Sequence, residues 1–217
     1  MSKIAFFDVD ETLIRPKSMF SFLRFYLENK RGDDSKVYEN FWTEIMNMTS
    51  CGASRSTVNK RYYEFWNGEK LADVNDAGLA WFESERQNDY FFIQPTVNAL
   101  KSHKEAGCLV AMISGSFESP LTPIANYLCV DYILCSQPEV IGGTMTGNIE
   151  QPMIGMNKSR AAQKLMEQHD ALPQECFAYG DHLSDIYLLE QVGHPRVVAN
   201  DPELITVATA RNWKILQ

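Results

Sequence analysis

The chain has 217 residues with 45% hydrophobic content and a formal net charge of -8 at pH 7, a composition that is ordinary for a packed globular protein and excludes a disordered chain. The excess of acidic over basic residues excludes a broad basic surface that could bind nucleic acid. No apolar run approaches the ~20 residues of a membrane span and no secretory signal is recognisable, so we expect a cytoplasmic protein without nucleic-acid or membrane partners.

Short apolar segments predict strands at residues 3–7, 108–113, 132–135, 176–179 and 196–199. Helices are predicted between the later strands, at residues 96–106, from about residue 121, and at 158–169, 184–192 and 202–211. Pro95 and Gly107 bracket the first of these helices, and Pro120 and Pro123 are expected in or just before the first turn of the second. The alternation predicts an α/β fold, a three-layer sandwich with a central parallel sheet and right-handed crossovers.

Residues 16–92 interrupt this alternation with a helix-patterned, aromatic segment, far longer than the dozen or more residues of an ordinary crossover. We therefore predict two domains: a core of residues 1–15 and 93–217, and a helical cap domain of residues 16–92 inserted into it. Most aromatic side chains of the cap are expected to form its own core, and a few are candidates to face a substrate. Residues 139–149 predict a hairpin.

The cysteines are odd in number and widely spaced, and no Cys-x-x-Cys pair or histidine cluster accompanies them. They predict small, mostly buried apolar side chains rather than a disulfide framework or a zinc site. The five cysteines are Cys51, Cys108, Cys129, Cys135 and Cys176.

The most informative segment is Asp8-Val9-Asp10-Glu11-Thr12, which comes directly after the first predicted strand. Ligands of open α/β sheets bind beyond the carboxyl ends of the strands. Two carboxylates two residues apart repel each other unless a cation or a shared proton offsets the repulsion, and Mg²⁺ is the obvious candidate. A lone Asp-x-Asp is usually a solvated turn, but Asp181 and Asp185 provide a second acidic pair after another apolar run, residues 176–178.

This arrangement favours phosphoryl transfer. A carboxylate at a strand end can attack an electrophile and form a covalent intermediate, and Asp8 is the expected nucleophile. A phosphate dianion repels such a carboxylate, so the site needs positive charge, and Mg²⁺ bound by Asp8 and Asp181 with a backbone carbonyl and waters would supply most of it. Ser114 with the following N–H groups, and Lys158, could bind the phosphate oxygens. Each of these is weak evidence alone, and their order along the chain carries the inference.

Four segments resemble the motifs of the haloacid dehalogenase superfamily phosphohydrolases: Asp8-Val9-Asp10-Glu11-Thr12, Ser114-Gly115-Ser116, Lys158, and Gly180-Asp181 with Asp185. The resemblance covers nearly the whole chain. The insertion after the first motif is similar to the cap of the phosphoserine-phosphatase-like subgroup, subfamily IB. The resemblance implies a Rossmann-like core and a Mg²⁺-dependent phosphatase that forms an aspartyl-phosphate.

The resemblance also implies the metal ligands and the catalytic acids. Asp8 would attack phosphorus and bind Mg²⁺. Asp10 would act as general acid and then as general base, and would bind the metal through its backbone carbonyl. Asp181 would be the third metal ligand.

The remaining motif residues would bind substrate or support the site. Ser114 and Lys158 would be catalytic residues that bind the phosphoryl group, with Gly115 beside them at the substrate. Asp185 would orient the groups around the metal, and Thr12 would support the loop of the first motif.

The expected substrate is a small phosphorylated metabolite. Phosphoserine phosphatases usually carry a cap Glu and Arg that bind the charged ends of the amino acid, and no matching pair stands out here, so phosphoserine itself is not predicted. Two other functions stay open: a phosphoacceptor signalling module, although receiver domains lack such an insertion, and a noncatalytic protein that binds a phosphorylated ligand. The oligomeric state also stays open. Candidate cap cations are Arg15, Lys17, Arg24 and Arg55.

Overall fold

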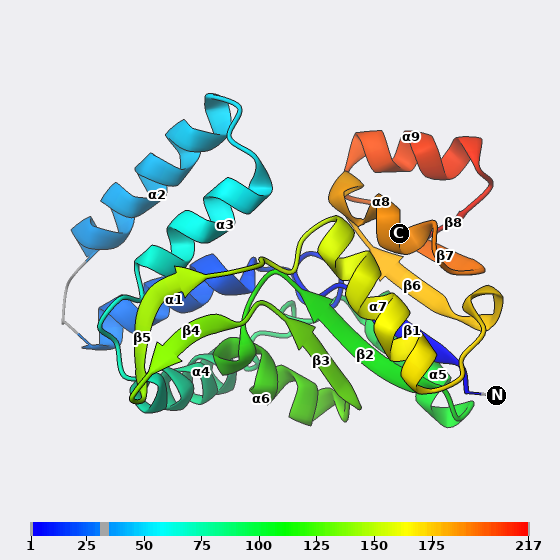
Figure 1. Ribbon diagram of the computed structural model, residues 1–217, viewed down its shortest axis with the longest axis horizontal. Coiled ribbons are helices and arrows are strands. Elements are labelled where there is room, and N and C mark those ends of the chain that lie inside the picture. The colour runs from blue at the N-terminus through cyan, green and yellow to red at the C-terminus, as the bar shows by residue number, and fades with distance from the viewer. Residues whose placement is uncertain (1, 31–34, 217) are drawn as a thin grey trace.

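A computed structural model describes residues 2–30 and 35–216 of the chain and contains a six-stranded parallel sheet (Figure 1). The strands are β1 Ile4–Phe7, β2 Leu109–Ser114, β3 Tyr132–Cys135, β6 Phe177–Gly180, β7 His194–Val198 and β8 Lys214–Leu216. They lie in the order β3-β2-β1-β6-β7-β8. The chain thus builds the sheet outward from β1 in one direction and from β6 in the other, and the order reverses between these two strands.

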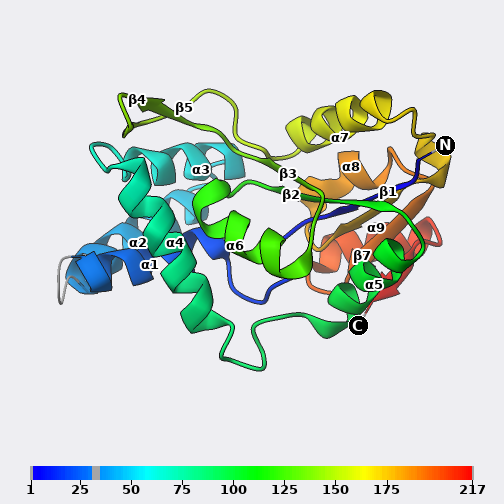
Figure 2. The ribbon, with the colours of Figure 1, turned by 90° about the horizontal axis from the view of Figure 1, so that it is seen from below.

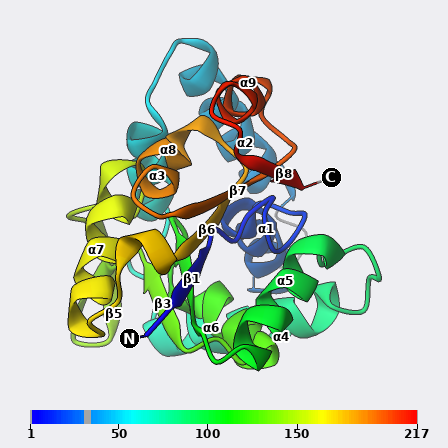
Figure 3. The same ribbon diagram turned by 90° about the vertical axis from the view of Figure 1, so that its right-hand side faces the viewer.

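Helices cover both faces of the sheet (Figure 3). They are α5 Gln94–Glu105, α6 Glu118–Leu128, α7 Met156–Gln168, α8 Ile186–Leu189 and α9 Pro202–Ala210. Along β1, Ala5 and Phe7 share an apolar cluster with α5 and α6, whereas Ile4 and Phe6 share one with α7, α8 and α9. Successive side chains of a strand point to opposite faces, so a strand covered on both faces is apolar throughout. The predicted three-layer α/β fold is confirmed.

Four further helices follow the first strand and add no strand to the sheet: α1 Ser18–Lys30, α2 Ser35–Ser50, α3 Arg55–Glu64 and α4 Leu71–Glu85. Their aromatic side chains pack together, as Phe22 stacks on Trp66 at a ring separation of 5.3 Å. Trp66 also lies 5.6 Å from Phe117, which precedes α6, and α4 lies beside α6 (Figure 2). The aromatic core of the cap therefore continues into the rest of the molecule. The division into a core of 1–15 and 93–217 and a cap of 16–92 stays a prediction.

The predicted hairpin consists of β4 Pro138–Ile141 and β5 Thr144–Ile149. Its backbone accepts hydrogen bonds from the α3–α4 loop and from the start of α4: the N–H of Gly68 donates to the carbonyl of Met145 at 2.9 Å, and the N–H of Leu71 donates to the carbonyl of Gly143 at 2.9 Å. A hairpin from the core part of the sequence therefore extends the cap.

Two helices differ from the sequence-based expectations. Helix α6 begins at Glu118 rather than near Leu121, so Pro123 lies inside it instead of in or before its first turn. Because proline has no N–H, one helical hydrogen bond stays unmade at Pro123. The helix expected at residues 184–192 is a 3-10 turn at Leu183–Asp185 followed by the short α8.

Strand β8 was not expected from the sequence; it pairs with β7 at the edge of the sheet. The five cysteines are free thiols. Cys108, Cys135 and Cys176 are buried, as expected for most of them, whereas Cys51 and Cys129 are exposed. Within residues 2–30 and 35–216, no helix is long and apolar enough to cross a membrane.

Candidate active site

Three of the predicted site residues stand at neighbouring strand ends. Asp8 follows β1, Ser114 is the last residue of β2, and Asp181 follows β6. Strand β1 pairs with both β2 and β6. These ends meet where the strand order reverses, which is where open α/β sheets bind ligands. The sheet thus brings residues from distant parts of the sequence to one edge.

Asp8, Asp181 and Asp185 form a buried acidic cluster. Each contributes a carboxylate oxygen, and these oxygens lie within 4.8 Å of one another. Gly180 makes room for the cluster, because a Cβ at this position would lie 2.9 Å from the Cβ of Asp185. Lys158, in the first turn of α7, places its Nζ 2.6 Å from Oδ1 of Asp8 and 2.7 Å from Oδ1 of Asp185. One buried ammonium therefore joins two of the three acids.

The charges of this cluster do not balance. Burial raises the pKa of Asp8 to about 8. The charge of Lys158 lowers this pKa, whereas repulsion from Asp185 and Asp181 raises it further. Burial also raises the pKa of Asp181, although a hydrogen bond from Asn200 opposes this. Burial would lower the pKa of Lys158, but Asp185 and Asp8 together raise it, so the ammonium stays charged. Three carboxylates share one ammonium, and their oxygen donors suit a hard divalent cation such as Mg²⁺.

Asp10 lies on the loop that follows β1. The next residue, Glu11, has a φ of 59°, a left-handed conformation that few residues other than glycine adopt. The N–H of Ser18 donates to Oδ1 of Asp10 at 3.0 Å and so orients its carboxylate. Burial, with repulsion from Asp8, raises the pKa of Asp10 to about 6. A carboxyl group with this pKa can serve as acid or base near neutral pH.

Ser114, Thr12 and Asn200 support the same edge of the sheet. The Oγ of Ser114 accepts a backbone N–H at 3.1 Å, which leaves its hydroxyl hydrogen able to donate to a ligand. The hydroxyl of Thr12 lies 3.4 Å from Oδ2 of Asp8 and 3.3 Å from Oδ1 of Asp181, so it links the first and fourth motifs. Asn200 donates to Oδ2 of Asp181 at 3.0 Å.

The carbonyl of Gly115 accepts hydrogen bonds from three side chains. The donors are Nδ2 of Asn59 at 2.9 Å, the hydroxyl of Tyr63 at 3.0 Å and the hydroxyl of Ser136 at 2.8 Å. A Cβ at Gly115 would lie 3.3 Å from Nδ2 of Asn59, so a side chain here would crowd this contact. Asn59 and Tyr63 belong to α3, and the cap therefore helps to fix the peptide that follows Ser114.

Sequence reasoning did not assign roles to Asn200, Asn59 or Tyr63. Asn200 follows β7 at the same sheet edge as Asp8, so the rule that located Asp8 could also have found it. Asn59 and Tyr63 gave no signal, because their partner lies far along the chain and helical spacing alone does not show where the cap meets the core.

The motif residues open into a cavity of about 380 Å³. We call its charged end the catalytic floor, formed by Asp8, Asp10, Ser114, Lys158 and Asp185. We call its apolar end the cap wall, formed by Met19, Phe20, Trp42, Ile45, Met46 and Val58. Gly115 also lines the cavity, whereas Asp181 belongs to the acidic cluster without lining it.

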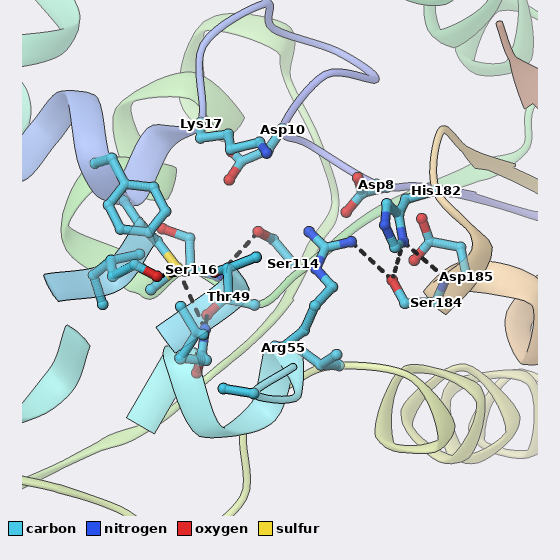
Figure 4. Close-up of a pocket in the computed structure, with 18 of the residues that line it drawn as sticks. Asp8, Asp10, Lys17, Thr49, Arg55, Ser114, Ser116, His182, Ser184 and Asp185 are labelled. Atoms are coloured by element: carbon cyan, nitrogen blue, oxygen red, sulfur yellow. Dashed lines mark hydrogen bonds between the residues drawn. The ribbon is translucent and has the colours of Figure 1, made fainter. Parts of the chain in front are cut away.

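Two of the candidate cap cations, Lys17 and Arg55, line the cavity, whereas Arg15 and Arg24 do not. Helix α3 begins at Arg55, and Nη1 of Arg55 donates to Oγ of Ser184 in the core at 3.0 Å. Figure 4 shows the guanidinium extending from α3 toward Ser184. The cap thus adds positive charge above the catalytic floor.

Comparisons with known proteins agree with this geometry. Residues 5–190 match the model of a family described as haloacid dehalogenase-like hydrolase. A probable phosphatase of Mycobacterium tuberculosis is 27% identical over 98% of this chain and 74% of its own length. A histidinol-phosphatase of Neisseria meningitidis is 28% identical over 100% of this chain and 99% of its own.

Solved structures share the fold. A protein of unknown function from Bordetella pertussis superposes with a TM-score of 0.85 at 22% identity, over 100% of this chain and 99% of its own. A phosphoserine phosphatase superposes with a TM-score of 0.68 at 18% identity, over 99% of this chain and 92% of its own.

The prediction of a phosphatase of this superfamily is confirmed. The likeness to the phosphoserine phosphatase shows a shared fold, and membership of the phosphoserine-phosphatase-like group stays a prediction. The roles of the individual site residues stay predictions. Because the family model spans most of the sequence, the chain belongs to the haloacid dehalogenase-like hydrolase family.

Proposed function

We propose that the protein is a Mg²⁺-dependent phosphatase that hydrolyses the phosphomonoester of a small metabolite through an aspartyl-phosphate on Asp8. The observation that carries this proposal is the 2.6 Å contact between Nζ of Lys158 and Oδ1 of Asp8 on the floor of the cavity. It combines a nucleophile at a strand end with a buried positive charge beside it, and phosphoryl transfer depends mainly on such positioning and charge neutralisation.

In the first step, an oxygen of Asp8 attacks phosphorus, the bond from phosphorus to the alcohol oxygen breaks, and an acyl phosphate forms on Asp8. Asp10, in its protonated form, donates its proton to the departing alcohol. In the second step, the Asp10 carboxylate takes a proton from water, which attacks the phosphoryl group, releases inorganic phosphate and restores Asp8. The bond from Ser18 to Oδ1 of Asp10 holds this side chain ready for both steps.

The other floor residues hold the phosphoryl group. The hydroxyl of Ser114, the backbone at Gly115 and the ammonium of Lys158 would donate to its oxygens. Asp8, Asp181 and the backbone carbonyl of Asp10 would hold Mg²⁺, which when bound neutralises charge on the phosphate oxygens.

One of the named relatives is called a histidinol-phosphatase, and one structural neighbour is a phosphoserine phosphatase. We extend only the general class, a small phosphorylated metabolite, to this chain. In this proposal the enzyme works in the cytoplasm, residues 16–92 act as its cap, and Thr12 and Asp185 orient the groups around the metal.

The test measures phosphate release from phenyl phosphate with Mg²⁺, with a chelator, and after Mg²⁺ is restored. We expect Mg²⁺-dependent repeated turnover that Asp8→Asn lowers by on the order of 10⁴-fold or more, because an amide is a poor nucleophile. Asp76→Asn is the matched control, since Asp76 is exposed on α4 away from the cavity. Near-normal turnover by a folded Asp8→Asn variant would contradict the proposal.

A further inference from the structure

The cap wall leaves large apolar side chains open to the cavity. Trp42 is 38% exposed and Met46, one turn later on α2, is 50% exposed, whereas Ile45 between them is buried. The ring of Phe20 meets Trp42 edge-on at 5.1 Å, and Tyr38 stacks on Trp42 at 6.4 Å. The indole is thus held in place while part of it stays uncovered. Apolar side chains of this kind, adjoining a reactive site, are typical of ligand contacts.

The wall carries no negative charge. Among the described residues that line the cavity, the acids are Asp8, Asp10 and Asp185, all on the catalytic floor. Two cations, Lys17 and Arg55, also line the cavity, and Lys17 pairs with Glu11 at 3.3 Å. An ammonium group on the leaving alcohol would lose water against the cap wall and would find no carboxylate there to pair with, which costs free energy. Phosphorylated amino acids and amino alcohols therefore fit the wall poorly.

The size of the cavity limits the alcohol further. Its volume is about 380 Å³, near the lower end of the roughly 300–1,000 Å³ range of ligand pockets. The phosphoryl group must occupy the part above the floor. The space that remains against the wall suits a single ring or a short branched chain and is too small for a long acyl chain.

We infer, on the basis of the proposed function, that the substrate is the phosphate monoester of a neutral alcohol whose body is one aromatic ring or a short branched aliphatic chain, bound against Trp42 and Met46. The reaction is the same hydrolysis: water cleaves the bond between phosphorus and the alcohol oxygen, and the neutral alcohol and inorganic phosphate leave. Trp42 and Met46 are then specificity-determining residues with no part in the transfer step.

The test compares kcat/KM for primary-alcohol esters that differ in the group facing the wall: phenethyl phosphate, phosphoethanolamine, phosphoserine and histidinol phosphate. We expect phenethyl phosphate to exceed phosphoethanolamine and phosphoserine by roughly 10-fold or more, since contacts of one or a few methylene groups already give such ratios. Histidinol phosphate, which has a ring and an ammonium group, should fall between them.

Variants of the wall sharpen the test. Trp42→Ala and Met46→Ala should each lower kcat/KM for phenethyl phosphate by roughly 5-fold or more and change that for phosphoethanolamine by less than about 2-fold. Met46→Glu, which keeps a long side chain at a half-exposed position, should shift the preference toward the ammonium-bearing esters. Leu79→Ala, which truncates a residue 54% exposed on α4 and outside the cavity, is the control.

The outcomes separate this inference from the proposed function. The inference would be overturned if kcat/KM for phosphoserine or histidinol phosphate equalled or exceeded that for phenethyl phosphate. It would also be overturned if Trp42→Ala affected all four esters equally. In either case, Mg²⁺-dependent turnover of phenyl phosphate would leave the proposed function standing. Absence of turnover for every ester would overturn both.

Discussion

The catalytic floor and the cap wall line the same cavity, but their side chains are held in different ways. On the floor, Asp8, Lys158 and Asp185 are buried and interlocked by charged contacts of 2.6 and 2.7 Å. On the wall, Trp42 and Met46 are partly exposed, and Trp42 is held by aromatic packing. A substitution on the floor therefore breaks these charged contacts, whereas we expect a substitution on the wall to have small effects on the rest of the molecule. We therefore expect the floor to determine the phosphoryl-transfer chemistry and the wall to determine which alcohol is accepted.

This division has one exception. Asn59 and Tyr63 lie on α3 in the cap but donate to the carbonyl of Gly115, the residue after Ser114. The cap therefore reaches into the floor at this carbonyl, and substitutions there should affect all substrates alike.

The largest effect on stability is expected at Lys158. Lys158→Met leaves three buried carboxylates without their ammonium, and loss of one partner of a buried ion pair costs about 3–5 kcal/mol. Urea unfolding in the presence of a chelator measures this change in the free energy of unfolding. Lys164→Met on the exposed side of α7 is the control and should change it by less than about 0.5 kcal/mol. Equal stability of the two variants would show that the charged contacts of Lys158 do not hold the floor together.

A smaller effect is expected at Tyr63. Tyr63→Phe removes one of the three donors to the carbonyl of Gly115, and the loss of about one hydrogen bond should lower kcat for all phosphate esters by roughly 3- to 10-fold. Tyr62→Phe is a matched control, because Tyr62 is the neighbouring residue on α3 and is equally buried, but is not one of the three donors to the carbonyl of Gly115. An effect of Tyr63→Phe on some esters only would place Tyr63 with the cap wall instead.

The smallest effect concerns the cap's own surface. Nε and Nη2 of Arg61 on α3 bond Oε1 and Oε2 of Glu44 on α2 at 2.6 and 2.8 Å, and these bonds lower the pKa of Glu44. Glu44→Gln should reduce the free energy of unfolding by about 0.5 kcal/mol, as for other exposed pairs. A carboxyl group with a lowered pKa stabilises the fold above its ordinary pKa and loses this contribution as the pH falls through the folded-state pKa. Thermal unfolding near neutral pH should show that Glu44→Gln is less stable than the unmodified protein, and this difference in stability should vanish in acid.

Much of the fold could be predicted because its signals are local. Strands buried on both faces are apolar throughout, as at Ile4–Phe7, and helices alternate with them. Strand β8 could not be predicted, because an edge strand is stabilised by its neighbour, here β7. The helical position of Pro123 could not be predicted either, because tertiary packing tolerates a proline that helix propensity would exclude. The contact of the β4–β5 hairpin with the α3–α4 loop is likewise long-range.

The two ends of the cavity also differ in whether their signals in the sequence are local or long-range. Asp8, Ser114 and Asp181 follow apolar strands, so their convergence could be expected from the sheet alone. Residues such as Trp42 reach the cavity only through the packing of α1, α2 and α3. Helical spacing identifies these side chains as apolar and partly buried, but it does not distinguish the core of the cap from a surface that faces a ligand.

The most direct test of the account is to trap the phosphoryl group on Asp8. The experiment uses the Asp10→Asn variant with Mg²⁺ and nitrophenyl phosphate, whose leaving group departs without a proton donor. The first step should therefore proceed in this variant. Hydrolysis of the acyl phosphate should slow by about 10² to 10⁴-fold, because it needs Asp10 as a base. Rapid acid quench and mass spectrometry of the peptides should then show close to one phosphoryl group per chain, on the peptide that contains Asp8, and none in Asp8→Asn. A phosphoryl group on another residue, or release of nitrophenol over many turnovers without any phosphorylated peptide, would contradict the account.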